Sequence, residues 1–176
     1  MAKVPYSKLK CKTNEEIKTI SFNDETIEVK QYLPIQEKLS LIGRVIELAH
    51  DQDYNYSNPV KADALKDLET LFAYTNITFT DKQKEDTAKL YDQVYSSGLL
   101  NAVIDAIPIE EVNDISVGVY DSIESVYKYQ NSVLGVLDTI KADYGDMNIN
   151  IDKLIKAFKD SPENLGTLKE VLDNFA

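Results

Sequence analysis

The spacing of apolar and polar positions changes near Pro34. Before this residue, apolar positions alternate with polar ones, as in a strand that buries one face, and the turn dipeptide Asn23-Asp24 separates two such stretches. We therefore predict a β-hairpin with a loop over residues 23–26. The opposite pairs expected on its apolar face are Phe22 with Ile27 and Ile20 with Val29. A third strand around Leu9 and Cys11 is a further option.

From Pro34 onwards, apolar residues recur every three or four positions, which is the period of an amphipathic helix. The first helix is predicted to bury Ile35, Leu39, Ile42, Ile46 and Ala49, in a stripe widened by Leu41, Val45 and Leu48. After a polar loop over residues 51–58, a second helix opens at Pro59. Its inward positions are expected to be Val60, Ala64, Leu68, Leu71 and Phe72.

Shorter helices are predicted next. Residues 76–79 are a β-prone break, and Thr80 with Gln83 forms a capping box that opens a third helix running to about Ser97. Gly98 suits the end of that helix, and Pro108 either stops a short fourth helix or starts the next one. The apolar positions of the fourth helix are Leu99, Leu100, Val103, Ile104 and Ile107.

A long helix is predicted from Glu110 to Tyr144, a segment without proline. At about 1.5 Å per residue it would span roughly 50 Å, so it would either cross the bundle or project an apolar seam toward another chain. Gly118 and Gly135 permit a bend or break. The heptad-like positions are Val112, Val119, Ile123, Val126, Val133, Leu137 and Ile140.

The C-terminal segment after Gly145 is predicted to form two short helices, and its last part carries an apolar stripe. This stripe is the candidate partner-binding site, because an apolar terminus either docks on its own domain or binds another protein. Its residues are Leu168, Val171, Leu172 and Phe175.

The predicted fold is therefore mainly α: a helical bundle with a long central or projecting helix and a small N-terminal β-hairpin. We expect a single domain over residues 1–176, because no linker divides the chain. Residues 1–33 form the hairpin region, 34–145 the helical core and 146–176 the C-terminal helical tail.

The charge of the chain limits the classes of partner that it is expected to bind. Its 176 residues include 30 acidic and 19 basic side chains, giving a net charge of −11, and Arg44 is the only arginine. Arginine provides the bidentate contacts that read phosphates and bases, and a negative field repels a polyanion. We therefore expect no nucleic-acid partner. The N-terminus lacks the apolar block of a signal peptide, and no apolar stretch is long enough for a membrane span, so no membrane partner is expected either.

The residues give no sign of catalytic, cofactor-binding or metal-binding chemistry. One cysteine, Cys11, and one histidine, His50, cannot form a disulfide or a zinc cluster within one chain. Residues 51–57 alternate oxygen-bearing side chains like a calcium loop, but Tyr56 and Ala62 replace the glycine and glutamate that the loop requires. His50 is expected to end the first helix. We predict a protein that is not an enzyme and has no cofactor.

Eleven tyrosines in a chain without tryptophan suit either protein interfaces or half-buried helix faces. The residues concerned are chiefly Tyr54, Tyr56, Tyr74, Tyr91, Tyr95, Tyr120, Tyr127 and Tyr129.

Three segments carry a resemblance to a known family. They are IEVKQYLPIQEKLSLI at residues 27–42, ETLFAYTNITFTDKQKEDTAKLYDQVYSSGLL at residues 69–100 and VIDAIPIEEVN at residues 103–113. They resemble a virion structural or assembly-region protein of tailed phages that infect low-GC Gram-positive bacteria. A strand pair followed by helices is also similar to phage tail assembly chaperones, by architecture only. The likeness covers roughly residues 3–145 and carries no assigned site residue.

This resemblance implies a non-enzymatic bacteriophage protein that binds other head, connector or tail proteins, as a tail assembly chaperone or an incorporated structural component. It would act in the host cytoplasm during assembly, or in the virion, and could form a homo-oligomer through the long helix. The alternative is an acidic anti-defence protein that inhibits a host nucleic-acid-binding system by mimicry. Lysines alternate with the acids in segments such as 63–67 and 81–86, which argues against that alternative.

Overall fold

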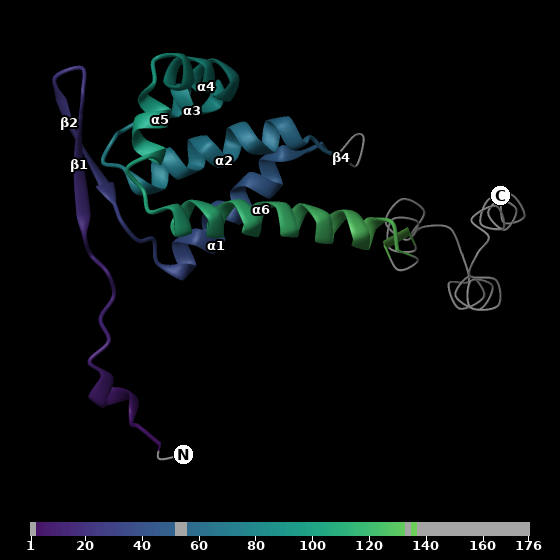
Figure 1. Cartoon of the computed structure of the whole chain (residues 1–176). Coiled ribbons are helices and arrows are strands. Elements are labelled where there is room, and N and C mark those ends of the chain that lie inside the picture. Colours follow the sequence, from purple (N-terminus) through teal and green to yellow (C-terminus); the bar gives the residue numbers. More distant parts are fainter. Residues whose placement is uncertain (1–2, 52–55, 133–134, 137–176) are drawn as a thin grey trace, which may run out of the picture. The chain divides into compact units, whose positions relative to one another are not determined.

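The computed structural model describes residues 3–51, 56–132 and 135–136, and these residues are mainly helical (Figure 1). By its internal contacts the chain divides into two units between Ile123 and Glu124. The single domain expected over residues 1–176 stays a prediction, because most of the second unit lies outside the described residues, together with the C-terminal tail.

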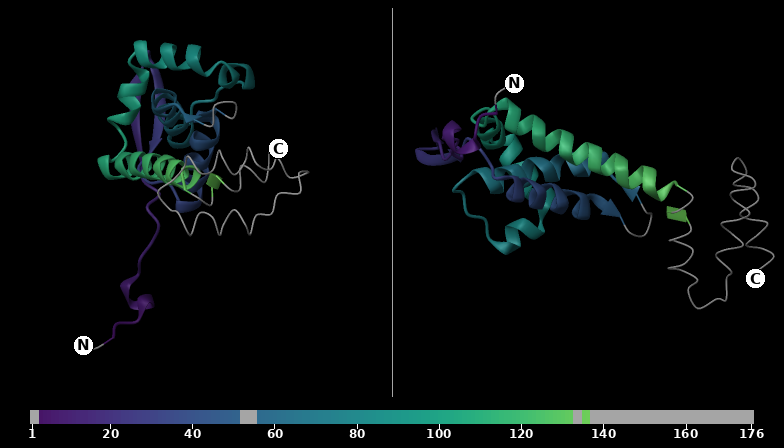
Figure 2. Two further views of the ribbon diagram at one scale, coloured as in Figure 1. Left: turned by 90° about the vertical axis from the view of Figure 1, so that its right-hand side faces the viewer. Right: turned by 90° about the horizontal axis from the view of Figure 1, so that it is seen from below.

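A β-hairpin precedes a set of helices in the described residues, and Figure 2 shows the first part of α6 running beside α1 and α2. The elements in chain order are the 3-10 turn η1 (Tyr6–Leu9), β1 (Ile17–Phe22), β2 (Glu25–Lys30), α1 (Ile35–Ala49), β3 (His50–Asp51), β4 (Tyr56–Ser57), α2 (Pro59–Tyr74), α3 (Asp81–Glu85), α4 (Thr87–Ser96), α5 (Leu99–Ile104) and α6 (Ile109–Gln130). The mainly α fold with an N-terminal hairpin is therefore confirmed.

The register of the hairpin differs from the prediction. Its loop has two residues, Asn23 and Asp24, and both have positive φ angles, of 49° and 64°. This is the backbone of a type I′ turn, which suits the twist of a hairpin and which Asn and Asp tolerate. Ile20 consequently pairs with Ile27 instead of Val29. A shift of two residues keeps the same side chains on the apolar face.

The third strand expected around Leu9 and Cys11 is not formed. Leu9 ends η1, Lys10 has a left-handed backbone with φ 50°, and Cys11 is exposed. Pro5 precedes the turn and accepts a hydrogen bond from the Lys8 N–H through its carbonyl, at 3.0 Å. A left-handed residue cannot continue a strand, so the segment remains outside the sheet.

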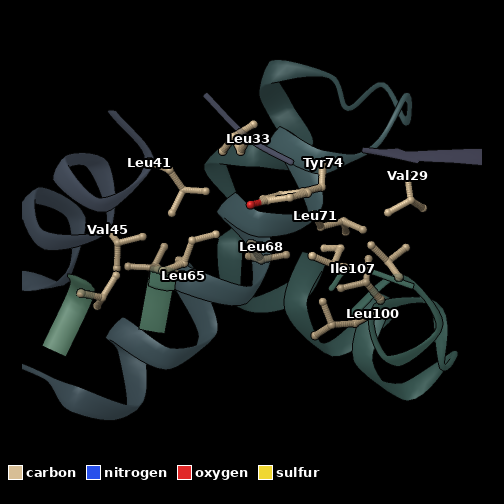
Figure 3. Packing of buried hydrophobic residues seen from close by; sticks show 14 of the residues in the cluster. Val29, Leu33, Leu41, Val45, Leu65, Leu68, Leu71, Tyr74, Leu100 and Ile107 are labelled. Atoms are coloured by element: carbon tan, nitrogen blue, oxygen red, sulfur yellow. The ribbon is translucent and has the colours of Figure 1, made fainter. Parts of the chain in front are cut away.

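The core lies between the hairpin, α1, α2, α5 and the first half of α6. Figure 3 shows Tyr74 at its centre, with leucines from several segments around it. Each fully buried leucine contributes roughly 1.5–3 kcal/mol to folding through the area that it removes from water. The largest fully buried side chains are Tyr74, Leu33, Leu41, Leu68, Leu71, Leu100, Ile115, Val29, Val45, Val103 and Val119.

The buried face of α1 is rotated from the predicted one. Its fully or nearly buried positions are Lys38, Leu41, Val45 and Ala49. Ile35 and Leu39, which were expected inward, are 60% and 55% exposed. Leu48 is also exposed, and Ile42 and Ile46 are half-buried. The apolar stripe of α1 is wide enough for two orientations, and the burial of a charged residue, Lys38, selects one of them.

The face of α2 agrees with the prediction except at its first turn. Leu68 and Leu71 are buried and Ala64 and Phe72 half-buried, but Val60 is 77% exposed. Val60 is the second residue of the helix, and none of the elements that the structure describes covers it. The expected cap is present, since the Asn58 side chain accepts from the Val60 and Lys61 backbone N–H groups.

The predicted third helix is divided at Asp86. The capping box between Thr80 and Gln83 is confirmed, but α3 ends at Glu85. The Asp86 side chain accepts a hydrogen bond from the Lys89 N–H at 3.3 Å and so caps a new helix, α4. The segment 76–79 lies between α2 and α3 without regular structure, as expected. α5 ends before Pro108, and α6 begins directly after it.

The long helix is shorter than the predicted segment from Glu110 to Tyr144, because α6 ends at Gln130. The Asn131 side chain donates to the Tyr127 carbonyl, and the Ser132 hydroxyl donates to the Tyr129 carbonyl. The Tyr127 carbonyl also keeps its ordinary helical bond from the Asn131 N–H, whereas the Tyr129 carbonyl, which residue 133 would use in a continuing helix, is taken by the N–H and hydroxyl of Ser132. A side chain on Gly135 would lie 2.1 Å from the Tyr129 carbonyl oxygen, so the chain turns back sharply there. Residues 137–144 lie outside the described residues.

Two glycines inside helices provide a test of the packing between α1 and α6. Alanine at Gly43 would meet nothing within 4 Å, whereas alanine at Gly118 would place its Cβ 2.5 Å from Ile42 Cδ1. We expect Gly43→Ala to raise the free energy of unfolding by about 1 kcal/mol, the difference in helix propensity. Gly118→Ala is expected to gain clearly less, because Ile42 must move. Urea unfolding of both variants measures the difference, and equal gains would contradict the packing described.

Candidate interaction surface

A buried carboxylate joins three segments of the first unit. Glu111, in the first turn of α6, accepts a hydrogen bond from the Leu33 N–H at 2.9 Å, one from Lys38 Nζ at 2.7 Å and one from the Tyr74 hydroxyl at 2.8 Å. The donors come from the segment after β2, from α1 and from α2. Both ends of the Lys38–Glu111 pair are about nine-tenths buried, so solvent screens it weakly.

These contacts set the protonation states. Burial by itself raises the pKa of Glu111, but the hydrogen bonds from Lys38, Leu33 and Tyr74 outweigh it and hold the pKa below its usual range. Burial likewise lowers the pKa of Lys38, but its hydrogen bonds to Glu111 and Asp114 outweigh that effect and raise the pKa. Burial, together with the hydrogen bond to Glu111, raises the pKa of Tyr74. At neutral pH the pair is therefore charged and Tyr74 is a neutral donor.

The same network fixes α1 beside α6. Lys38 Nζ lies 2.7 Å from Glu111 and 3.1 Å from Asp114, and one turn later Ile42 contacts Gly118. From Lys38 to Ile42 and from Asp114 to Gly118 both helices advance by four residues in the same direction, so they run parallel at this contact. The absence of a side chain at Gly118 allows this close approach.

On the outer side of this helix pair lies a surface that we call the seam surface. Ile35, Leu39, Ile42 and Ile46 follow one row of α1 at helical spacing, and the first two are mostly exposed. Ile42 of this row contacts Gly118, so the row runs along the side of α1 that is turned toward α6. We define the seam surface as Ile35, Leu39 and Ile46 of α1 with Glu110, Asp114, Val117 and Asp121 of α6.

The α6 part of the seam surface is acidic. One face of α6 carries four residues spaced by four, three and four positions: Glu110, Asp114, Val117 and Asp121. All four are exposed, and the Asp114 side chain remains 66% exposed although it contacts Lys38. The seam surface therefore combines an apolar row with a negatively charged border.

A second polar cluster holds α6 against α2. Lys66 Nζ lies 2.7 Å from Asp63 and 3.5 Å from Asp67, and the Tyr120 hydroxyl donates to Asp63. Hydrogen bonds from Lys66 and Tyr120 lower the pKa of Asp63, whereas burial raises that of Asp67. The single arginine, Arg44, pairs at 2.7 Å with Glu69 of α2, so its guanidinium is used within the fold.

Most residues singled out from the sequence lie away from the seam surface. The predicted partner-binding residues Leu168, Val171, Leu172 and Phe175 lie outside the described residues. His50 follows the last residue of α1, as expected, with its Nδ1 3.4 Å from the Ser57 hydroxyl.

The tyrosines divide between core and surface. Tyr74 is fully buried, so the interface interpretation fails for this residue, while Tyr91 is half-buried. Tyr54 lies outside the described residues. The exposed tyrosines among those singled out are Tyr56, Tyr95, Tyr120, Tyr127 and Tyr129, and Tyr6 is exposed as well.

Sequence reasoning missed Lys38 and Glu111 as site residues, because charged side chains on a helix are normally exposed. The one available signal was that both interrupt apolar rows, Lys38 between Leu41 and Pro34 and Glu111 before Ile115.

An open depression of about 590 Å³ lies along α3 and α4. It has lysines and acids on the same wall: Lys82, Lys89, Glu85 and Asp86. In the part of the chain that the structure describes, no group of three or more His, Cys, Asp or Glu residues could hold a metal ion. None of the helices described there has the length and apolar content that crossing a bilayer requires.

Comparison with known proteins gives no match: no protein-family model fits the chain, and no curated protein and no solved structure is similar to it.

Replacing Glu111 tests the buried network. We expect Glu111→Gln to lower the free energy of unfolding by about 3 kcal/mol at neutral pH, because Lys38 keeps its charge and loses its buried counter-charge. Glu47→Gln, an exposed position on α1, is the matched control and should change stability by less than about 0.5 kcal/mol. Equal effects of the two substitutions would contradict the network.

The stability difference between the natural chain and Glu111→Gln should depend on pH. The pKa of Glu111 is lowered by folding, so its stabilisation is present above the ordinary carboxyl pKa and is lost as the pH falls through the folded value. We therefore expect the difference in stability between the natural chain and Glu111→Gln to shrink from about pH 7 to about pH 3. Chemical unfolding across this range measures it. A difference that stays constant would show that Glu111 does not act through its charge.

Proposed function

We propose that the protein is a non-enzymatic component of a tailed-phage virion or of its assembly and binds other head, connector or tail proteins. The observation that carries the proposal is the seam surface, where Ile35 and Leu39 of α1 and Val117 of α6 are each more than half exposed. Contiguous exposed apolar side chains with a polar border are typical of protein interaction sites, whereas single exposed ones are ordinary.

Two further observations support the same class. The segments 27–42, 69–100 and 103–113 resemble a phage virion or assembly-region protein. In addition, Tyr127 and Tyr129 near the end of α6 are 62% and 51% exposed, and exposed tyrosines combine a large contact area with a hydrogen-bonding tip. Within this class, an assembly chaperone and an incorporated structural component are equally compatible with these features.

An acidic inhibitor that mimics nucleic acid is the second candidate, favoured by the net charge of −11. Several acids pair with lysines, as in Lys30–Glu37, Lys38–Asp114 and Lys66–Asp63. These pairs lower the negative charge that a basic groove would meet, so protein assembly stays the first proposal.

Mass spectrometry of phage particles and assembly intermediates tests the function. We expect peptides of this chain in purified virions if it is an incorporated component, and only in assembly intermediates if it is a chaperone. The control is the infected-cell lysate, which shows that the protein is made. Its presence in the lysate but in neither particles nor intermediates would contradict the proposal, as would its absence from any phage genome.

Partner binding by the C-terminal stripe is a separate prediction. In the first variant, serine replaces the four stripe residues Leu168, Val171, Leu172 and Phe175. In a second variant, serine replaces Tyr127 and Tyr129. We expect the first variant to lose co-purification of identified phage head, connector or tail proteins, because serine removes the apolar area that drives association. The circular dichroism spectrum, which should remain helical, controls for folding. Unchanged co-purification would rule out the stripe as the binding site.

A further inference from the structure

The N-terminal segment has the opposite character to the rest of the chain. We call residues 3–16 the arm. Within it, residues 3–12 contain four lysines and no acid, which gives them a charge of +4. Because the net charge of the chain is −11, all other residues together carry −15. The arm also presents Val4, Tyr6 and Leu9, each more than half exposed. It is thus a basic segment with apolar side chains on an otherwise strongly acidic protein.

Among the residues that the structure describes, none covers the arm. Every residue from 3 to 16 is exposed. Its hydrogen bonds are local, such as Glu16 N–H to the Asn14 side chain, until the Gln31 N–H donates to the Glu16 carbonyl at the start of the hairpin. Figure 1 shows the arm as the purple segment that leads from β1 to the N-terminus. Val4, Tyr6 and Leu9 lie within six residues, and covering their apolar side chains would be favourable.

The seam surface has the complementary properties. It offers an apolar row on α1, which Val4, Tyr6 and Leu9 could cover, and an acidic row on α6, which the arm lysines could neutralise. The root of the arm is near one end of it: Ile17 pairs with Lys30, and Lys30 Nζ lies 3.2 Å from Glu37 in the first turn of α1. Fourteen extended residues reach at most about 45 Å, which exceeds the length of α1, about 22 Å.

We propose that the arm of one copy binds the seam surface of a second copy of this chain, and that two copies exchange arms reciprocally. Reciprocal exchange places the same contacts on both copies, which is the closed two-fold arrangement common among homodimers. Two acidic bodies repel each other, and the arm lysines offset that repulsion at the contact. The interface differs from a long-helix seam and does not depend on the function proposed above.

A cross-linking experiment uses the natural Cys11, the only cysteine of the chain, as the reporter on the arm. In the Leu39→Cys variant, mild oxidation should join Cys11 to residue 39. Equal amounts of isotopically heavy and light protein are mixed before oxidation, and the linked peptides are identified by mass spectrometry. The control is Lys82→Cys, an exposed position on α3 outside the seam surface.

Arm exchange predicts mixed heavy–light pairs that link Cys11 to residue 39, and only background linkage to residue 82 in the control. Pairs linking Cys11 to residue 39 within a single copy, heavy–heavy and light–light alone, would show that the arm folds onto its own chain and would overturn the proposal. Absence of this linkage, with only Cys11–Cys11 pairs formed, would overturn it as well.

Sedimentation of the full chain over a range of concentrations provides a test without cysteines. The natural chain should form dimers, and Lys8→Glu with Lys10→Glu should raise the Kd for dimerisation at least about tenfold, equivalent to about 1.4 kcal/mol. Lys82→Glu with Lys84→Glu changes the net charge equally and should leave the Kd within about twofold. Adding Glu110→Lys to the arm variant should restore part of the affinity. A natural chain that is monomeric at every concentration, or equal Kd values for the arm and control variants, would overturn the proposal.

Discussion

The buried Glu111 carboxylate is the constraint on which the arrangement of the first unit depends. Three donors from three segments converge on its two oxygens, and one of them is the charged amine of Lys38. A buried charge without a partner costs several kcal/mol, so an arrangement that separates Lys38 from Glu111 is strongly disfavoured. The carboxylate therefore selects one rotation of α1 and one position for the start of α6, where apolar packing alone would tolerate several.

This selection determines what the molecule presents to solvent. With Lys38 turned inward, the row containing Ile35 and Leu39 faces outward, although the same row would have made a good core face. The close approach of Ile42 to Gly118 then places the acidic row of α6 along its edge. The buried Lys38–Glu111 pair thus leaves the apolar row of α1 exposed at the seam surface. The interaction role that we propose depends on that surface.

The net charge of the chain conceals an uneven distribution. Some lysines of the helices form pairs with acids, such as Lys38 with Glu111 and Lys66 with Asp63, whereas the arm contains lysines and no acid before Glu15. Ion pairs between exposed side chains contribute little to stability, but a basic segment facing an acidic surface can decide which partner is bound. The reciprocal contact between two copies follows from this asymmetry.

Local rules in the sequence were sufficient for the elements whose signals are local. The turn at Asn23-Asp24, the capping box at Thr80, the cap at Asn58 and the start of α6 after Pro108 each depend on residues within four positions of one another. Helical periodicity likewise identified the mainly α fold. By contrast, the apolar pattern suited a loop of two or of four residues, and the positive φ angles of Asn23 and Asp24 decided the register. The end of α6 depended on the bonds from Ser132 to the Tyr129 carbonyl.

The tertiary structure alone decided the orientation of α1 and the composition of the candidate site. Lys38 and Glu111 are 73 positions apart, and a single sequence contains no signal that two charged residues at such a distance will meet. The apolar stripe of α1 was broad enough for either face to be buried, because hydrophobic burial has no direction. The hydrogen bonds to Glu111 are directional, and they determined which face was buried.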